Sequence, residues 1–259
     1  MKIISLIITY YSTNEERFSF LKQSLESLYQ TINYLPVEIL VVDNGSRIDD
    51  SKYLLELVHN GKINTYIRNN LNLHFGMARN QGLNLCNGDF ICIADSDILY
   101  GQGWLDKCLT VLDAFPDEKI YATPIYNVAH WLPKFWDPKV LKVGNDTYRL
   151  NKRAGSNCFV MRRQDFEEVG DFKVHRVAGT KWTEEAREKG YLAAVTPERM
   201  VIDMGFRKGY NHKAVIPIKQ ILSNREEVYF NQDEFKKNHG GLHHIQQRKF
   251  NPQAYRTIV

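Results

Sequence analysis

The first hundred residues alternate short apolar runs with amphipathic segments, and this order constrains the fold more than any other feature. Apolar runs at residues 3–9, 37–42, 64–68 and 90–94 are typical of strands. Between them lie segments at 18–32, 53–58 and 75–87 that favour helices, the first with apolar residues every three or four positions. Strand–helix alternation predicts a parallel sheet covered by helices on both faces. We therefore predict an α/β protein.

Polar residues stand at the ends of three of these predicted strands. Thr9 and Tyr10 end the first strand, Asp43 ends the second, and Asp95 and Asp97 follow the fourth. Ligands of parallel α/β sheets bind beyond the carboxyl ends of the strands. We expect these residues to converge on one edge of the sheet and to form a ligand site.

Asp95 and Asp97 are separated by one residue after a strand that reads as buried on both faces. Residues two apart on an extended chain point the same way, so the two carboxylates repel each other. A divalent cation relieves that repulsion, which makes the pair a candidate metal site. A surface turn after a strand is the alternative interpretation.

Chain length and cysteine spacing narrow the class of protein. The 259 residues include four cysteines without a zinc-type spacing or a disulfide pattern, which fits a reducing cytosol. No apolar run is long enough to span a bilayer, and residues 3–9 read as a strand rather than as part of a signal peptide. We expect a cytoplasmic protein, with the inner face of the membrane as the alternative location.

The charge is unevenly placed along the chain. Residues 206–259 carry ten Lys and Arg against four Asp and Glu, whereas residues 1–205 carry 24 against 26. A basic tail favours contact with phosphates or with an anionic membrane surface, and a solvated surface is the alternative. No nucleic-acid-binding motif accompanies the charge, so we expect no nucleic-acid partner.

The second half of the chain has a less regular pattern. Residues 125–150 are rich in Trp and Pro and predict a long loop or a small subdomain. Residues 157–161 and 192–195 predict strands, and residues 163–169 and 183–189 predict helices, the second stopped by Gly190. We expect one composite domain over residues 1–205 and a basic C-terminal extension over residues 206–259.

Several motifs together resemble one known family. They lie at residues 7–10, 41–46, 72–82 and 94–97, followed by 155–163 and 166–172. Their order and spacing resemble family 2 glycosyltransferases with the GT-A fold, over about residues 3–205. The resemblance implies a mostly parallel central sheet flanked by helices, with a nucleotide-sugar-binding half at 1–100 and an acceptor half at 101–205. It also implies metal-dependent, inverting transfer of a sugar from a nucleotide-diphosphate sugar to an acceptor hydroxyl.

The resemblance also implies roles for individual residues on the donor side. Thr9 and Tyr10 would line the base pocket, with the Tyr ring stacked on the base, and Asp43 would accept hydrogen bonds from base or ribose or else cap its turn. Gly76 would let the backbone approach the ligand, and Asn80 would be a polar support. Arg79 would pair with Asp95 or with phosphate. Asp95 would face the ribose.

Asp97 would ligate Mn²⁺ or Mg²⁺, as the resemblance implies. Asp203 stands where relatives often have a metal-binding His, and His212 is another candidate ligand. His239, His243 and His244 could also reach the diphosphate, although a polar tail is the simpler interpretation. The donor would be a UDP- or GDP-sugar, and the acceptor a glycan or a lipid-linked saccharide, as in polysaccharide biosynthesis.

The catalytic base is the point at which this chain departs from its relatives. Many carry a Glu-Asp pair that would fall near Gly179 and Thr180, where this sequence has no carboxylate. Glu184 and Glu185 are the nearest candidates, unless they are surface helix residues. Asp171 and His175 are further candidates. A nucleotidyltransferase, or a non-catalytic nucleotide-sugar-binding protein that has lost its base, are the alternative functions.

Overall fold

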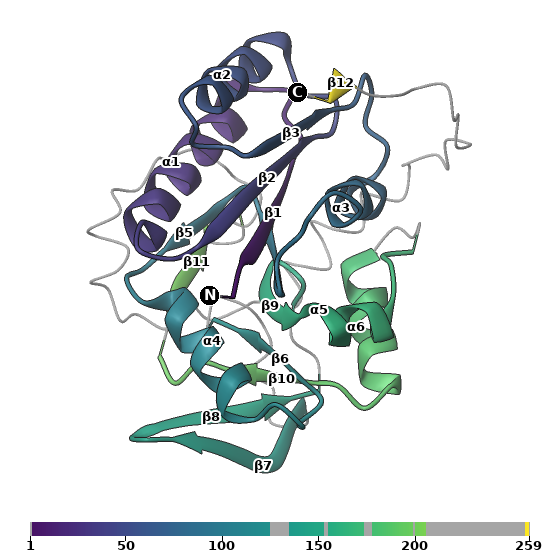
Figure 1. Cartoon of the computed structure of the whole chain (residues 1–259). Helices are drawn as coiled ribbons and strands as arrows, with labels where there is room; N and C mark the ends of the chain where they lie inside the picture. The colour runs from purple at the N-terminus through teal and green to yellow at the C-terminus, as the bar shows by residue number, and fades with distance from the viewer. Residues whose placement is uncertain are drawn as a thin grey trace, which may run out of the picture.

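The fold is a large mixed sheet with helices on both faces (Figure 1). The computed structural model describes residues 2–124, 135–152, 155–173, 178–198 and 200–205, and the backbone of 257–258. Its elements are, in chain order, β1 (Ile4–Tyr10), α1 (Glu15–Ile32), β2 (Val37–Asp43), α2 (Ile48–His59), β3 (Thr65–Arg68), α3 (Phe75–Leu83), β4 (Phe90–Asp95), β5 (Ile98–Tyr100), α4 (Trp104–Ala114), β6 (Ile120–Thr123), β7 (Trp136–Val143), β8 (Asp146–Asn151), β9 (Cys158–Arg162), α5 (Arg163–Val169), α6 (Ala178–Glu188), β10 (Leu192–Val195), β11 (Val201–Asp203) and β12 (Thr257–Ile258).

The central sheet has the strand order β12-β3-β2-β1-β4-β9-β6-β10-β8-β7. Strands β3, β2, β1 and β4 pair in parallel, as do β6 and β10. Strand β9 is antiparallel to both β4 and β6, so the parallel set β3-β2-β1-β4 and the parallel pair β6-β10 run in the same direction. The prediction of an α/β fold with a mostly parallel central sheet is confirmed.

The two faces of the sheet bury alternate residues of each strand. Ile4, Leu6 and Ile8 of β1 lie in one core cluster with residues of α1, α2 and α4. Ile7 lies in the opposite cluster with residues of α5 and α6, and α3 lies across β1–β3 from α1 and α2 (Figure 1). The period-two alternation of β1 explains why it needs a helical layer on each side.

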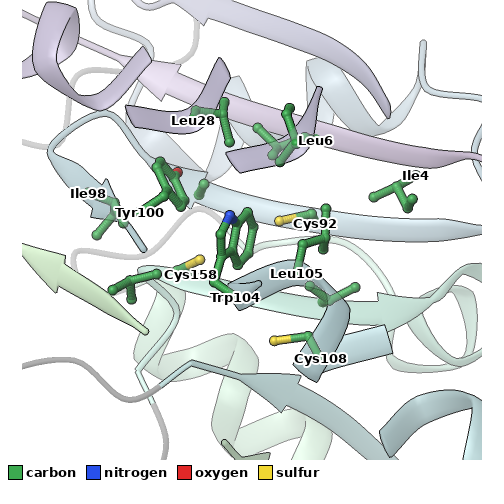
Figure 2. Packing of buried hydrophobic residues seen from close by; sticks show 14 of the residues in the cluster. Ile4, Leu6, Leu28, Cys92, Ile98, Tyr100, Trp104, Leu105, Cys108 and Cys158 are labelled. Carbon is green, nitrogen blue, oxygen red and sulfur yellow. The ribbon is translucent and has the colours of Figure 1, made fainter. Parts of the chain in front are cut away.

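Figure 2 shows part of the first cluster around Trp104, at the start of α4. The indole is fully buried, and its ring centroid lies 4.8 Å from that of Tyr100. Cys92, Cys108 and Cys158 are buried in the same cluster and are free thiols. A small thiol fills core space as a modest hydrophobe would.

A second, two-stranded sheet is formed by β5 and β11, which pair antiparallel. Leu99 of β5 and Ile202 of β11 pack with Phe20 of α1 in a separate buried cluster. This short ribbon therefore fixes the residues that follow β4 against those that follow β11.

Two predictions of local structure need correction. Of the two alternatives for residues 125–150, a long loop or a small subdomain, the loop is wrong for residues 136–151, which form the β7–β8 hairpin; a bulge between Trp136 and Val140 breaks the alternation that would have signalled it. Helix α6 begins at Ala178, five residues before the predicted start, and ends before Gly190, whose φ of 91° suits a helix stop. Residues 125–134 lie outside the described residues, and the domain boundary at 205 stays a prediction.

Candidate functional site

The predicted convergence of strand ends is confirmed in the sheet register. Thr9 pairs with Asp95 of β4, and Tyr10 pairs with Asp43 of β2. Asn157, just before the antiparallel strand β9, reaches the same edge, where its carbonyl accepts the Asp95 N–H at 2.7 Å. The carboxyl ends of β1, β2 and β4 therefore meet the start of β9.

Asp97 and Asp203 are brought together by the β5–β11 ribbon. The Met204 N–H donates to the Asp97 carbonyl at 2.8 Å, and Asn157 Nδ2 donates to Asp203 Oδ2 at 2.7 Å. A Cβ placed on Gly205 would lie 2.5 Å from Asp97 Oδ2 and 3.4 Å from Asp203 Oδ1. Oxygens of the two carboxylates thus flank one point in space, which only a glycine leaves open.

The electrostatics of this pair favour a cation. Burial raises the pKa of the Asp97 carboxyl well above its usual value, and the charges of Asp203 and Asp95 raise it further. Like charges held this close are relieved by a positive ion or by a proton. The site therefore carries excess negative charge, which a bound cation would neutralise.

Asp97 and Asp203 fit a hard divalent cation whose remaining coordination positions are filled by a bound ligand. Among the described residues, no group of three or more His, Cys, Asp and Glu is placed to hold a metal alone. Mg²⁺ is commonly bound by one or two carboxylates together with substrate phosphates, which Asp97 and Asp203 satisfy. His212, the other predicted ligand, lies outside the described residues, as do the three histidines of the tail.

Arg79 is a buried cation that contacts Asp95. Its Nη2 donates to Asp95 Oδ1 at 2.6 Å and to the Ser156 carbonyl at 3.1 Å. The guanidinium carbon lies 4.9 Å from the Phe75 ring centroid and 5.0 Å from that of Phe172, so the group is stacked between two rings. The predicted pairing of Arg79 with Asp95 is therefore present in the structure.

The electrostatic effect on Asp95 has two opposing parts. Burial raises the pKa of the Asp95 carboxyl, and the Arg79 charge and hydrogen bond lower it, with the net shift upward. Arg79 Nε and Nη1 are buried and make no hydrogen bond within the described part of the chain. The Arg fork thus orients Asp95 without using all its donors.

Asn80 and Gly76 tie α3 to residues 172–173 and to the start of α6. Asn80 Nδ2 donates to the Phe172 carbonyl, and the Phe172 N–H donates to Asn80 Oδ1, both at 2.9 Å. Asn80 is thus a support, as predicted. A Cβ on Gly76 would lie 3.0 Å from the Lys173 carbonyl oxygen and 3.1 Å from Ala178 Cβ. The close neighbour of Gly76 on its Cβ side is therefore the protein itself, and its role beside a ligand stays a prediction.

Asp43 and Tyr10 are fully buried, which changes their expected roles. Asp43 accepts hydrogen bonds from Ser51 Oγ at 2.6 Å, Tyr66 Oη at 2.9 Å and Arg68 Nη1 at 3.0 Å, besides the Ser46 N–H of its own turn. These bonds correspond to the turn-capping alternative.

The Tyr10 hydroxyl donates to Asp50 at 2.7 Å. Because the Tyr10 ring is enclosed in the core, it offers no face on which a base could stack.

Three residues that sequence reasoning missed lie at the same edge. Tyr11, the residue after β1, has 40% of its surface exposed, and Thr9 Oγ1 beside it is buried without a hydrogen-bond partner in the described structure. Asn157 and Gly205 complete the carboxylate pair. Strand alternation could have identified Tyr11, because residues 10 and 11 must point to opposite sides.

The two candidate bases lie on α6, away from its first turn. A Cβ placed on Gly179, in that turn, would lie 3.5 Å from Arg79 Nη1, so the start of α6 adjoins the site. Glu184 and Glu185 follow five and six residues later, about 8–9 Å along the helix axis. Their carboxylates lie 3.8 Å from the Lys181 and Lys173 ammonium groups. Their role stays a prediction.

Two further candidates for the base remain. Asp171 is an exposed residue of the turn after α5, and His175 lies outside the described residues. The structure thus brings together the metal candidates Asp97 and Asp203 with Asp95, and does not gather the candidate bases.

Comparison with known proteins agrees with this geometry. The model of the family "Glycosyl transferase family 2" matches residues 5–170. A curated relative, an uncharacterized glycosyltransferase of Methanocaldococcus jannaschii, is 28% identical over 95 residues, which is 37% of this chain and 32% of that protein.

Solved structures share the fold at low sequence identity. GalNAc-T7 with UDP, GalNAc and Mn²⁺ has a TM-score of 0.61 and 16% identity, covering 78% of this chain and 43% of that one. A mannosyltransferase of Pyrobaculum calidifontis in complex with GDP-Man and Mn²⁺ has a TM-score of 0.58 and 14% identity, and the match covers 91% of this chain and 67% of that one. TarS of S. aureus has a TM-score of 0.58 and 16% identity, and the match covers 92% of this chain and 43% of that one.

The chain spans about a third of the curated relative and less than half of GalNAc-T7 and TarS. These structural likenesses therefore show the fold. The family model, in contrast, covers more than half of the 259 residues. The chain belongs to glycosyl transferase family 2.

Proposed function

We propose that this protein transfers a sugar from a nucleotide-diphosphate sugar to an acceptor hydroxyl, with a divalent cation. The observation that carries the proposal is the approach of Asp97 and Asp203 at the carboxyl edge of the sheet. Asp97 and Asp203 would hold Mn²⁺ or Mg²⁺, which would supply positive charge to stabilise the diphosphate leaving group. Asn157 would orient Asp203 through its hydrogen bond to Oδ2.

On the donor side, we assign the base platform to Tyr11 instead of Tyr10. Tyr11 is exposed and directly follows β1, two residues after Thr9, which pairs with Asp95, and a Tyr ring can stack on a base. Asp95, which Arg79 orients, would accept a hydrogen bond from the ribose. The structures of GalNAc-T7 with UDP and of the mannosyltransferase with GDP-Man support a UDP- or GDP-sugar as the donor.

On the acceptor side, we propose inverting transfer with Glu184 or Glu185 as the base that takes the hydroxyl proton. Both lie on the helix whose first turn adjoins Arg79. Removing a general base lowers kcat by about 10²–10⁴-fold. Glu184→Gln and Glu185→Gln test the assignment, with exposed Glu188→Gln on the same helix as the control. Full activity in both variants would remove these residues from the mechanism.

The acceptor would be a glycan or a lipid-linked saccharide, in a cytoplasmic reaction of polysaccharide biosynthesis. The basic extension at 206–259 favours contact with an anionic membrane surface. Within the described residues, no helix combines the length and the apolar character that crossing a bilayer requires.

The experiment that tests the proposal measures nucleotide release. Wild-type protein is incubated with UDP-glucose, UDP-N-acetylglucosamine and GDP-mannose, with MnCl₂ or with EDTA, and released UDP or GDP is quantified. We expect turnover that EDTA abolishes and that Asp97→Asn or Asp203→Asn lowers about 100-fold. Asp113→Asn, an exposed aspartate paired with Lys2, is the control and keeps full activity.

The alternatives are distinguished by which substrates react. A nucleotidyltransferase, supplied with a nucleoside triphosphate and a sugar phosphate in a separate reaction, would release pyrophosphate from the triphosphate. A non-catalytic protein would bind a nucleotide sugar without any release. Absence of both binding and turnover across the panel would contradict the proposed function.

A further inference from the structure

Arg17 lies in the first turn of α1, the helix that packs on β5 (Figure 1). Further along α1, the Ser27 hydroxyl accepts the Tyr100 N–H at 3.2 Å, and Phe20 lies in a buried cluster with Leu99. Moving back along α1 therefore means moving back along β5. Arg17 precedes Phe20 by one turn and shares its face of the helix, so it lies toward the residues that come before Leu99.

The residues before Leu99 lead to the carboxylate pair. Strand β5 begins directly after Asp97. Met204 belongs to the same buried cluster as Phe20, and the next residue is Gly205, whose Cβ position lies 2.5 Å from Asp97 Oδ2. The first turn of α1 is thus at the end of the β5–β11 ribbon where the carboxylates lie.

The charge of Arg17 acts on both carboxylates that follow β4. Burial raises the pKa of the Asp95 carboxyl, and the charges of Arg79 and Arg17 lower it. At Asp97, burial and the neighbouring carboxylates raise the pKa, and the Arg17 charge opposes them. The Arg17 guanidinium is therefore near enough to both groups for its charge to be felt at each.

Arg17 does not bridge either carboxylate, however. Asp95 forms its ion pair with Arg79 at 2.6 Å, and Arg17 forms none with another described residue. Its backbone N–H donates to Asn14 Oδ1 at 3.0 Å, which is a capping bond of α1 and leaves the side chain out. The residue is half-buried, so part of it can be reached from outside. Among the described residues, then, the donors of this guanidinium are not used.

Charge balance indicates what these donors are for. Arg17 and a divalent cation held by Asp97 and Asp203 carry like charges, so they repel each other. An anion that contacts both removes this repulsion, and the diphosphate of a nucleotide sugar is such an anion. The planar guanidinium fork also matches phosphate oxygens better than any other side chain does.

The proposed reaction makes that anion more negative. The acceptor oxygen forms a bond to the anomeric carbon and gives its proton to the base, while the bond from that carbon to the phosphate oxygen breaks. The electron pair of the broken bond stays on the phosphate oxygen. A fixed cation beside it stabilises the transition state more than the bound donor.

We propose that Arg17 binds the diphosphate of the donor and stabilises the charge that its outer phosphate gains when the sugar leaves. The inference rests on the proposed function and deepens it, because it assigns a side chain of this protein to the leaving group.

The test compares nucleotides with and without phosphates. Calorimetry with saturating MnCl₂ should show that Arg17→Gln lowers the affinity for UDP or GDP about tenfold or more, as expected for a lost charge-assisted hydrogen bond. Arg17→Lys keeps the charge and should lose less. Affinity for uridine or guanosine should be unchanged in both variants, because these ligands carry no phosphate. For the nucleotide sugar with the highest turnover, kcat should fall with Arg17→Gln as well.

A control on the same helix separates contact from overall charge. Lys22 is exposed, and its ammonium lies 4.3 Å from the Phe18 ring centroid. Lys22→Gln removes the same charge from α1 and should leave UDP and GDP affinity at the wild-type value. The melting temperature of Arg17→Gln should equal that of wild type, because the side chain forms no ion pair with the described residues.

Two results would overturn the inference. One is an Arg17→Gln protein that binds UDP and GDP as wild type does. The other is an equal loss of affinity for the nucleotide and for its nucleoside, which would mean a structural role. If wild type itself binds neither UDP nor GDP with MnCl₂, the proposed function fails; if wild type binds and the variant binds equally well, the inference about Arg17 fails alone.

Discussion

Gly179, in the first turn of α6, offers the sharpest test of how α6 packs against the segment before β9. A Cβ at this position would lie 1.7 Å from Ser156 Oγ and 2.8 Å from Ser156 Cβ. Rotating the Ser156 side chain would move Oγ but leave Cβ in place. A side chain at 179 therefore requires the backbone of α6 or of the segment before β9 to shift.

The magnitude follows from two opposing effects of Gly179→Ala. Replacing glycine by alanine inside a helix stabilises by about 1 kcal/mol. Overpacking a tight contact costs about 1–3 kcal/mol, and the obstacle here includes a Cβ that cannot rotate away. The cost prevails, and we expect the variant to be less stable by about 1–2 kcal/mol.

Urea denaturation of four proteins measures this effect: wild type, Gly179→Ala, Ser156→Gly and the double variant. The double variant should recover the lost stability, with a coupling free energy of about 1–3 kcal/mol. Additive changes, or a Gly179→Ala protein as stable as wild type, would refute the packing described.

Three further predictions concern the site and the sheet. Gly205→Ala would push Asp97 Oδ2 from its place, lowering the Mn²⁺-dependent affinity for UDP or GDP about tenfold or more by calorimetry; unchanged affinity would contradict the carboxylate geometry. Tyr11→Ala should weaken nucleotide binding about tenfold, whereas Tyr11→Phe should not, because stacking needs only the ring; equal loss in both would exclude stacking. At Glu38, burial raises the pKa, but hydrogen bonds from the Ser5 hydroxyl and two backbone N–H groups outweigh it and lower the net value. Its stabilisation should be present above the ordinary Glu pKa and lost as the pH falls through the lowered value. Urea denaturation should therefore show that Glu38→Gln costs less stability at pH 3 than at pH 7, and an equal difference at both pH values would contradict this.

Local patterns predicted the donor half of the fold because each of its strands is framed by clear signals. The apolar run of β4 ends at Asp95, and α5 was predicted with its observed bounds, Arg163–Val169. Parallel order then implied that Thr9, Asp43 and Asp95 meet at one edge, as they do.

What could not be predicted depends on contacts between distant residues. Strands β5 and β11 have three residues each, too few for a periodic pattern, yet they decide that Asp203 lies beside Asp97. The burial of Asp43 depends on Tyr66 and Arg68, which are 23 and 25 residues further along. Propensity and periodicity report on neighbours in the chain, so they carry no information about such pairings.

The central claim is that Asp97 and Asp203 together hold a cation against the donor diphosphate. A crystal structure with UDP or GDP and Mn²⁺, with anomalous diffraction at the manganese edge, tests it most directly. We predict a single strong anomalous peak within about 2.0–2.4 Å of an oxygen of each carboxylate and of the diphosphate. A nucleotide bound at this edge without a peak there, or a peak away from both aspartates, would contradict the account.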